Sequence, residues 1–169
     1  MTFEEAFAIA DKITGWLSKD EAKLLWKAAN ATRGIILEVG CFHGRSTSIL
    51  SAFGRQVYAV DQFSGFDTLD MSGAKAKADF LANARPNVVL FHERIESWKP
   101  RPVGFAYLDG DHSYNGTKAQ IRKALSCRPQ AIAIHDVNDT GEGREIKKAA
   151  ISLLGPWQTR IERLAVWVR

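Results

Sequence analysis

The chain has 169 residues, of which 46% are hydrophobic, and a net charge of +4 at neutral pH. It holds no repeat, no low-complexity tract and no apolar run near the ~20 residues of a membrane span. The acidic, amphipathic start is unlike a signal peptide, and two cysteines, Cys41 and Cys127, make no disulfide framework. We therefore expect a cytoplasmic protein with a single domain over residues 1–169, in which residues 1–32 form a helical lead-in.

Two helices are expected before the first strand. Thr2 and Glu5 have the spacing of a capping box, and Ser18 and Glu21 repeat it. In this motif a hydroxyl and a carboxylate satisfy free N–H groups at the start of a helix. Apolar residues recur at helical spacing after each pair, as far as Ile13 in the first helix.

Short apolar runs then alternate with helical patterns. Strands are expected at residues 35–39, 56–61, 88–91, 104–109 and 131–136, and helices at 46–53, 73–84, 115–125 and 146–154. This alternation predicts an α/β fold, a Rossmann-like doubly wound sheet of seven strands with helices on both faces. The last two strands, at 157–161 and 164–169, are spaced as a hairpin, so the final strand is expected to run antiparallel in a mostly parallel sheet.

Four of the expected strands end in an acidic residue: Glu38, Asp61, Asp109 and Asp136. The carboxyl ends of parallel strands lie at one edge of the sheet, where open α/β folds bind their ligands. A single acid there would be interpreted as a helix cap or a loop residue. Because four occur at equivalent positions, we expect them to meet in one crevice.

A glycine turn of the form E-x-G-x-x-x-G, residues 38–44, follows the first strand. A dinucleotide site would have G-x-G-x-x-G, but here Cys41 stands at the second glycine, and no Walker lysine is present. Glu38 would repel phosphates but suits an ammonium or sulfonium group. Asp61 is placed to accept both ribose hydroxyls. A nucleoside with a positive centre and no phosphate is S-adenosylmethionine, which we expect to bind in preference to NAD.

Four segments in order, "LEVGCFHGRST", "VYAVDQF", "AYLDGDHSY" and "IAIHDV", resemble successive motifs of the class I S-adenosylmethionine-dependent methyltransferases. They are similar to a small bacterial methyltransferase-domain branch that resembles O-methyltransferases, and the similarity covers nearly the whole chain. The resemblance implies transfer of a methyl group from S-adenosylmethionine to a small-molecule acceptor, with a hydroxyl oxygen as the expected target.

The resemblance also implies where the donor binds. The residues from Gly40 to Ser46 would surround its methionine part, with Cys41 as a small turn residue. Asp61 would hold the ribose, and the segments after the second and third strands would flank the adenine. The residues implied for donor binding are Glu38, Gly40, Cys41, Gly44, Ser46, Asp61, Gln62, Glu93, Arg94, Ile95 and Asp109.

The acceptor side is expected at a cluster of acids and imidazoles, namely Asp109, Asp111, His112, His135 and Asp136. Enzymes that methylate amino groups resemble one another in an Asn/Asp-Pro-Pro-Tyr/Phe motif after the fourth strand, which this chain lacks. The cluster resembles the site of divalent-cation-dependent O-methyltransferases, although His135-Asp136 replaces their acid-amide pair. Two alternatives stay open: Mg²⁺ held by Asp109 and Asp136, or His112 or His135 as general base on a hydroxyl.

Two other functions compete with this interpretation. One is a nucleoside-binding domain without transfer activity, which would have no need for the acceptor-side cluster. The other is an RNA methyltransferase, whose binding would weaken steeply with salt; the scattered basic residues disfavour a nucleic-acid partner. Because the late loops are short, the pocket is expected to be open or to be completed by a second copy in a homodimer. A small hydroxylated molecule, such as a sugar or a secondary metabolite, is the expected acceptor.

Overall fold

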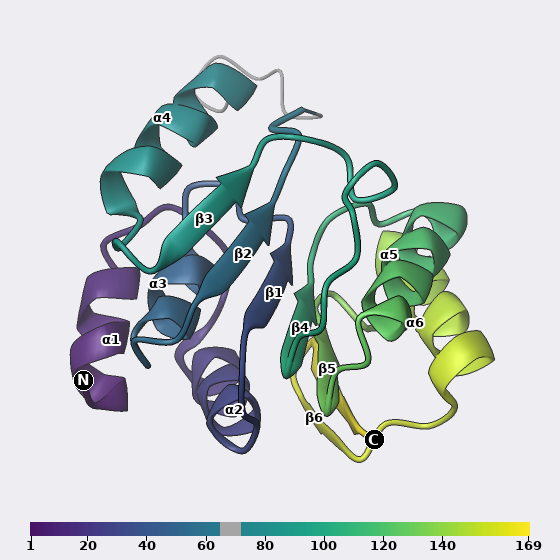
Figure 1. Cartoon of the computed structure of the whole chain (residues 1–169). Helices are drawn as coiled ribbons and strands as arrows, with labels where there is room; N and C mark the ends of the chain where they lie inside the picture. The colour runs from purple at the N-terminus through teal and green to yellow at the C-terminus, as the bar shows by residue number, and fades with distance from the viewer. Residues whose placement is uncertain (65–71) are drawn as a thin grey trace.

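The computed structural model describes residues 1–64 and 72–169 (Figure 1). Its strands are β1 (Ile36–Val39), β2 (Val57–Val60), β3 (Val88–Phe91), β4 (Phe105–Leu108), β5 (Ala131–Ile134), β6 (Thr159–Ile161) and β7 (Leu164–Val168). They form one sheet in the order β3-β2-β1-β4-β5-β7-β6. Neighbours from β3 to β5 pair in parallel, and β7 runs antiparallel to both β5 and β6. The expected doubly wound fold is confirmed.

Helices cover both faces of this sheet (Figure 1). They are α1 (Phe3–Ala10), α2 (Lys19–Asn30), α3 (Arg45–Ser51), α4 (Gly73–Asn83), α5 (Tyr114–Ser126) and α6 (Gly141–Leu154). The first three pack with Ile36 and Phe105 on one face, while α5 and α6 pack with Leu37 and Ala106 on the other. Successive strand residues point to opposite faces, so both faces of β1 and β4 are buried, which explains their continuous apolar runs. Within the described ranges, no helix combines the length and hydropathy needed to cross a membrane.

Both expected capping boxes are present, at the starts of α1 and α2. The expectation that the first helix reaches Ile13 is wrong, because α1 ends at Ala10. The Arg45 guanidinium donates to the carbonyl oxygens of Asp11, Ile13 and Leu17, at 3.4, 3.0 and 3.0 Å. These contacts hold the segment after α1 as an irregular loop against the start of α3.

The strand register brings the acidic strand ends to one edge. Val39 at the end of β1 lies opposite Val60 in β2 and Leu108 in β4, and Leu108 lies opposite Ile134 in β5. The residues that follow these strands therefore leave the sheet side by side. This alignment positions the candidate site.

Glu38 is a buried carboxyl inside β1, with no exposed surface. The Ser46 hydroxyl donates to its Oε1 at 2.5 Å, whereas its Oε2 is buried without a hydrogen-bond partner among the described residues. Burial, assisted by the charges of Asp109 and Asp61, raises the pKa of Glu38 to about 8. At neutral pH this side chain is therefore mostly protonated.

We expect Glu38→Gln to flatten the decline of stability with rising pH. The folded chain keeps the Glu38 proton up to about pH 8, whereas the unfolded chain loses it near 4.5. Its contribution to the free energy of unfolding is therefore complete below pH 4.5 and is lost as the pH rises toward 8. Glutamine is neutral throughout, so the variant lacks this slope. Thermal unfolding at several pH values between 4.5 and 8 measures the effect, with the exposed Glu4→Gln as control. If the wild type and Glu38→Gln lost stability with pH at the same rate, the pKa of Glu38 would be an ordinary one.

Candidate active site

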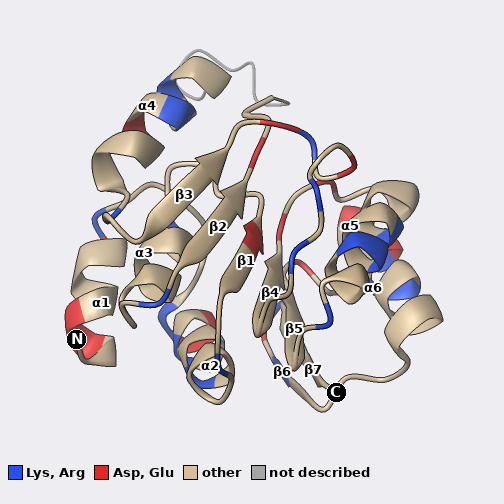
Figure 2. Ribbon diagram, in the orientation of Figure 1, with Lys and Arg blue, Asp and Glu red and all other residues tan. Residues whose placement is uncertain are grey.

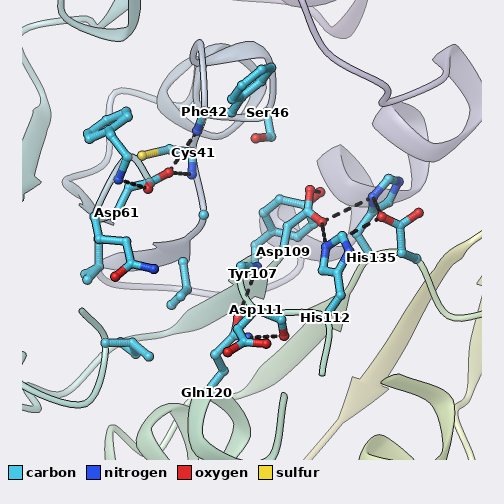
Figure 3. A pocket seen from close by; sticks show the side chains of 18 of the residues that line it. Cys41, Phe42, Ser46, Asp61, Tyr107, Asp109, Asp111, His112, Gln120 and His135 are labelled. Atoms are coloured by element: carbon cyan, nitrogen blue, oxygen red, sulfur yellow. Dashed lines mark hydrogen bonds and ion pairs between the residues drawn. The ribbon is translucent and has the colours of Figure 1, made fainter. Parts of the chain in front are cut away.

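A cavity of about 830 Å³ lies beyond the carboxyl ends of β1, β2, β4 and β5. Figure 3 shows the glycine turn and Asp61 on one side of it and the carboxylate–imidazole cluster on the other. Most of the expected site residues line it: Gly40, Cys41, Ser46, Asp61, Gln62, Glu93, Arg94, Ile95, Asp109, Asp111, His112, His135 and Asp136. Glu38 and Gly44 lie outside its described lining, where Glu38 supports Ser46 and Gly44 precedes α3.

The glycine turn depends on a close approach between β1 and β4. Gly40 has a φ of +79°, and a Cβ there would overlap the carbonyl oxygen of Asp109. Only glycine meets both requirements at low cost. Cys41 next to it is buried, and burial raises the pKa of its thiol well above the ordinary value. Burial therefore favours the protonated thiol of Cys41.

Asp61 holds the glycine turn in place. The backbone N–H groups of Cys41 and Phe42 donate to its Oδ2, at 2.7 and 3.0 Å, and that of Phe63 donates to its Oδ1 at 2.7 Å. A carboxylate offers about four acceptor positions, so three are filled from within the chain. Asp61 lies on the cavity wall, but its first task is to join the end of β2 to the turn after β1.

The acceptor-side cluster gathers around the ring of His135. Its Nδ1 lies 3.4 Å from Asp109 Oδ1 and 3.6 Å from Asp136 Oδ2, and its Nε2 lies 3.2 Å from Glu21 Oε2. His112 lies on the cavity side of the same acids, with Nε2 at 3.6 and 3.7 Å from these two oxygens. Figure 3 shows both rings directed at Asp109.

The surroundings of His135 favour its protonated form. Burial alone would lower its pKa, but the carboxylates of Asp109, Asp136 and Glu21 outweigh burial and raise the pKa to about 12. An imidazole that keeps its proton at working pH cannot take one from a hydroxyl. The structure therefore argues against His135 as the general base and leaves His112, the other imidazole that the sequence offered for this role.

His112 is the more accessible imidazole, with about a third of its side chain exposed. Asp109 above all, together with Asp136 and Glu142, raises the pKa of His112 against the opposing effect of burial. Glu142 Oε2 lies 3.3 Å from its Nδ1, and the Glu142 side chain is 80% exposed. His112 thus has the access to the cavity that a proton acceptor needs.

A divalent metal fits this cluster poorly. Asp109, His112 and Asp136 could each offer one ligand atom, since these atoms lie within 4.8 Å of one another. The two carboxylates, however, already face the buried cationic ring of His135. A Mg²⁺ ion bound to them would lie beside that ring, and the described residues that group there as ligands are one imidazole and two carboxylates, although Mg²⁺ prefers oxygen ligands. The cluster as folded is built around a protein cation.

The other side of the cavity fits a nucleoside with a positive centre. Gln62 follows β2 on the wall, and Glu93, Arg94 and Ile95 follow β3. In a dinucleotide site, the backbone N–H groups of this turn would donate to a phosphate. Here the N–H groups of Cys41 and Phe42 donate to Asp61 instead. This arrangement disfavours a pyrophosphate and leaves the turn free to contact an uncharged or cationic group.

Sequence reasoning missed several residues that contact the cluster, among them Glu142, Glu21 and Arg163. Glu21 has a capping-box spacing, which predicted a helix start and gave no sign of its ion pair with His135. Arg163 lies in the turn between β6 and β7, and its Nη1 is 2.8 Å from Asp136 Oδ1. No local pattern marks Glu21 or Arg163, because both reach the site only through the packing of α2 and of the terminal hairpin.

We expect Asp61→Ala to lower both stability and affinity for S-adenosylmethionine. The substitution removes three hydrogen bonds to a charged acceptor. We therefore expect the free energy of unfolding to fall by about 2–4 kcal/mol. Donor affinity should fall at least about tenfold because the turn loses its support. Gln62→Ala is the matched control for stability alone, since it leaves the three bonds in place. Denaturant unfolding and calorimetry measure the two effects; unchanged stability would contradict the role of Asp61 in the turn.

Known proteins of this fold include methyltransferases. CalS11, described as a TDP-rhamnose 3'-O-methyltransferase of calicheamicin biosynthesis, is 16% identical over 98% of this chain and 92% of its own, with a TM-score of 0.63. An O-methyltransferase from Bacillus cereus, solved in complex with SAH, is 20% identical over 99% and 90%, with a TM-score of 0.62. Cofactor-bound Rv0187 from MTB is 16% identical over 98% and 88%, with a TM-score of 0.67. At these identities the likeness shows the fold.

The family is shown by a direct match of sequence. The family described as "Methyltransferase domain" matches residues 37–137, which run from β1 through the end of β5 and include both sides of the cavity. The glycine turn, Asp61 and the acceptor-side cluster all fall inside this match, whereas Glu21 and Arg163 fall outside it. The chain belongs to the methyltransferase domain family.

Proposed function

We propose that this chain transfers a methyl group from S-adenosylmethionine to a hydroxyl oxygen of a small molecule. The observation that carries the proposal is the shared cavity, in which the phosphate-free glycine turn faces a carboxylate–imidazole cluster. A site that only bound the nucleoside would have no use for that cluster. The O-methyltransferase descriptions of CalS11 and of the Bacillus cereus protein support a hydroxyl as the acceptor.

The donor side would hold S-adenosylmethionine through the turn and through the segments after β2 and β3. When bound, S-adenosylmethionine supplies an electrophilic methyl group on a sulfonium centre. The turn around Gly40 and Ser46 would contact the methionine part, and Asp61 would offer its remaining acceptor position to the ribose. Gln62 and Ile95 would border the adenine. The nearby acids favour a cationic ligand over an anionic one.

On the acceptor side, His112 would take the proton from the attacking hydroxyl. Its ring lies on the cavity wall, held between Asp109 and Asp136 and bordered by Glu142. These acids stabilise the imidazolium that forms when the proton arrives. Asp109 is in turn held by the Tyr107 hydroxyl, which donates to its Oδ2 at 3.0 Å. His135 would keep both acids in position without exchanging a proton.

The acceptor would enter from the side of the lead-in. Trp16 lines the cavity, is 57% exposed and stacks on Phe42 with ring centroids 5.4 Å apart. A flat apolar surface of this kind suits a sugar or an aromatic ring. An RNA acceptor is less well supported, because Lys and Arg are distributed among α2, α4, α5 and α6 (Figure 2).

The residues named here all come from one chain, and we propose that they act as a single domain. Cys41 and Cys127 are both buried free thiols. This supports a reducing compartment such as the cytoplasm for the proposed reaction.

We expect the protein to bind S-adenosylmethionine, or its demethylated product, and not NAD. The turn lacks the glycine spacing and the free N–H groups that a pyrophosphate needs. Isothermal titration calorimetry with the three ligands tests this expectation directly. Comparable affinity for NAD, or no binding of the methyl donor, would overturn the proposed function.

We expect the rate of methyl transfer to rise with pH as His112 loses its proton, and Glu142→Gln to shift that rise to lower pH. Removing a negative neighbour lowers the pKa of an imidazolium. Because Glu142 is exposed, the shift should be modest, about 0.2–0.7 pH unit. The profile of kcat against pH is measured with a labelled donor and a panel of hydroxylated acceptors.

The matched control is Asp139→Asn, which removes the same charge just before α6 from a carboxylate paired with Lys147. It should leave the profile in place. His112→Ala should lower the rate by about 10²–10⁴. A His112→Ala variant with wild-type kcat would remove His112 from the mechanism.

A further inference from the structure

The contacts around His135 form a continuous chain from the lead-in to the cavity. Glu21 in α2 lies behind the ring, and Asp109 and Asp136 lie in front of it. His135 is 3% exposed and Glu21 is fully buried. A buried carboxylate is stable only with partners, and the His135 ring lies within ion-pair distance of Glu21, with 3.2 Å between Nε2 and Oε2.

Glu21 is itself fixed from two directions. The backbone N–H of Ser18 donates to its Oε2 at 3.0 Å, and that of Arg163 donates to its Oε1 at 3.0 Å. His135 lowers the pKa of Glu21 against the effect of burial, so the carboxylate stays charged. One side chain thereby ties α2 and the β6–β7 turn to the ring at the end of β5.

The outer oxygens of the two acids are also occupied. The Tyr107 hydroxyl donates to Asp109 Oδ2, and the Arg163 guanidinium faces Asp136 Oδ1. Three buried or half-buried carboxylates, Glu21, Asp109 and Asp136, thus face two basic side chains, His135 and Arg163. These side chains already occupy the carboxylates, so a divalent ion would have to displace part of this set.

We propose that the Glu21–His135 pair is an internal bridge that holds Asp109 and Asp136 where a divalent metal would otherwise bind, and that this chain therefore works without one. Glu21 is a positioning residue of this bridge, since it acts on the acids through His135. The role of the bridge in methyl transfer rests on the proposed function, whereas the contacts that form the bridge do not depend on it.

The first test measures the binding of Mn²⁺. Binding is monitored through the loss of the free Mn²⁺ signal in electron paramagnetic resonance. The wild type should bind Mn²⁺ no more tightly than Asp136→Asn, within about threefold. His135→Asp, which replaces the cation by a third carboxylate, should bind it at least about tenfold more tightly. Circular dichroism checks the fold of each variant. If His135→Asp does not fold, the comparison of the wild type with Asp136→Asn still decides.

Tight, micromolar binding of Mn²⁺ by the wild type that Asp136→Asn abolishes would overturn the proposal. So would a folded His135→Asp variant with no gain in affinity. Neither result depends on an acceptor or on the methyl donor. Failure of the bridge and failure of the proposed function are therefore separate outcomes, since the latter is decided by binding of S-adenosylmethionine.

The second test follows the ring of His135 by ¹⁵N nuclear magnetic resonance. In the wild type the ring should remain doubly protonated from about pH 6 to about pH 9. Glu21→Gln should lower its titration midpoint by about one unit or more, and Glu21→Asp should restore part of the shift. Asp20→Asn, an exposed change on the same turn of α2, should leave the midpoint unchanged. A ring that is neutral at pH 7 in the wild type, or unaffected by Glu21→Gln, would overturn the positioning role.

Discussion

The structure depends on how it accommodates four carboxyl groups at one edge of a buried sheet. A parallel sheet brings the ends of β1, β2, β4 and β5 together; Asp61, Asp109 and Asp136 follow three of these ends, whereas Glu38, expected from the sequence at the fourth, lies inside β1 and outside the cavity lining. Like charges in a confined space repel, so each acid must be either protonated or stabilised by hydrogen-bond donors or a nearby cation. Glu38 keeps its proton, Asp61 accepts backbone N–H groups, and Asp109 and Asp136 share the cation of His135. The two sides of the cavity differ because these solutions differ.

The helical lead-in is part of this arrangement. Arg45 at the start of α3 binds three carbonyl groups of the loop after α1, so the loop that carries Trp16 lies against the cavity. Glu21 in α2 supports His135 from behind. Arg163 adds a contact to the Trp16 carbonyl oxygen at 3.3 Å. Residues outside the matched family segment therefore hold the reactive edge together and shape its entrance.

Much of the site could be predicted because its residues follow strands. A period-2 or continuous apolar run shows where a parallel strand ends; Asp61 and Asp109 come directly after such runs, and Asp136 follows one residue later, after His135. Their convergence then follows from topology alone. What stayed open was the state of His112 and His135, since both are imidazoles next to acids in the sequence. Their roles differ only through burial and through the acids that reach them from elsewhere.

By itself the sequence determined the doubly wound fold, the capped helices of the lead-in and the phosphate-free glycine turn, because each depends on spacing and residue type within a short segment. Only the tertiary structure decided that Asp61 accepts hydrogen bonds from the turn and that Glu38 is buried against Ser46. It also decided that His135 forms an ion pair with Glu21. These properties arise from contacts between segments far apart in the chain. Local sequence patterns do not predict such contacts, because the packing of the whole chain determines which group pairs with a buried charge.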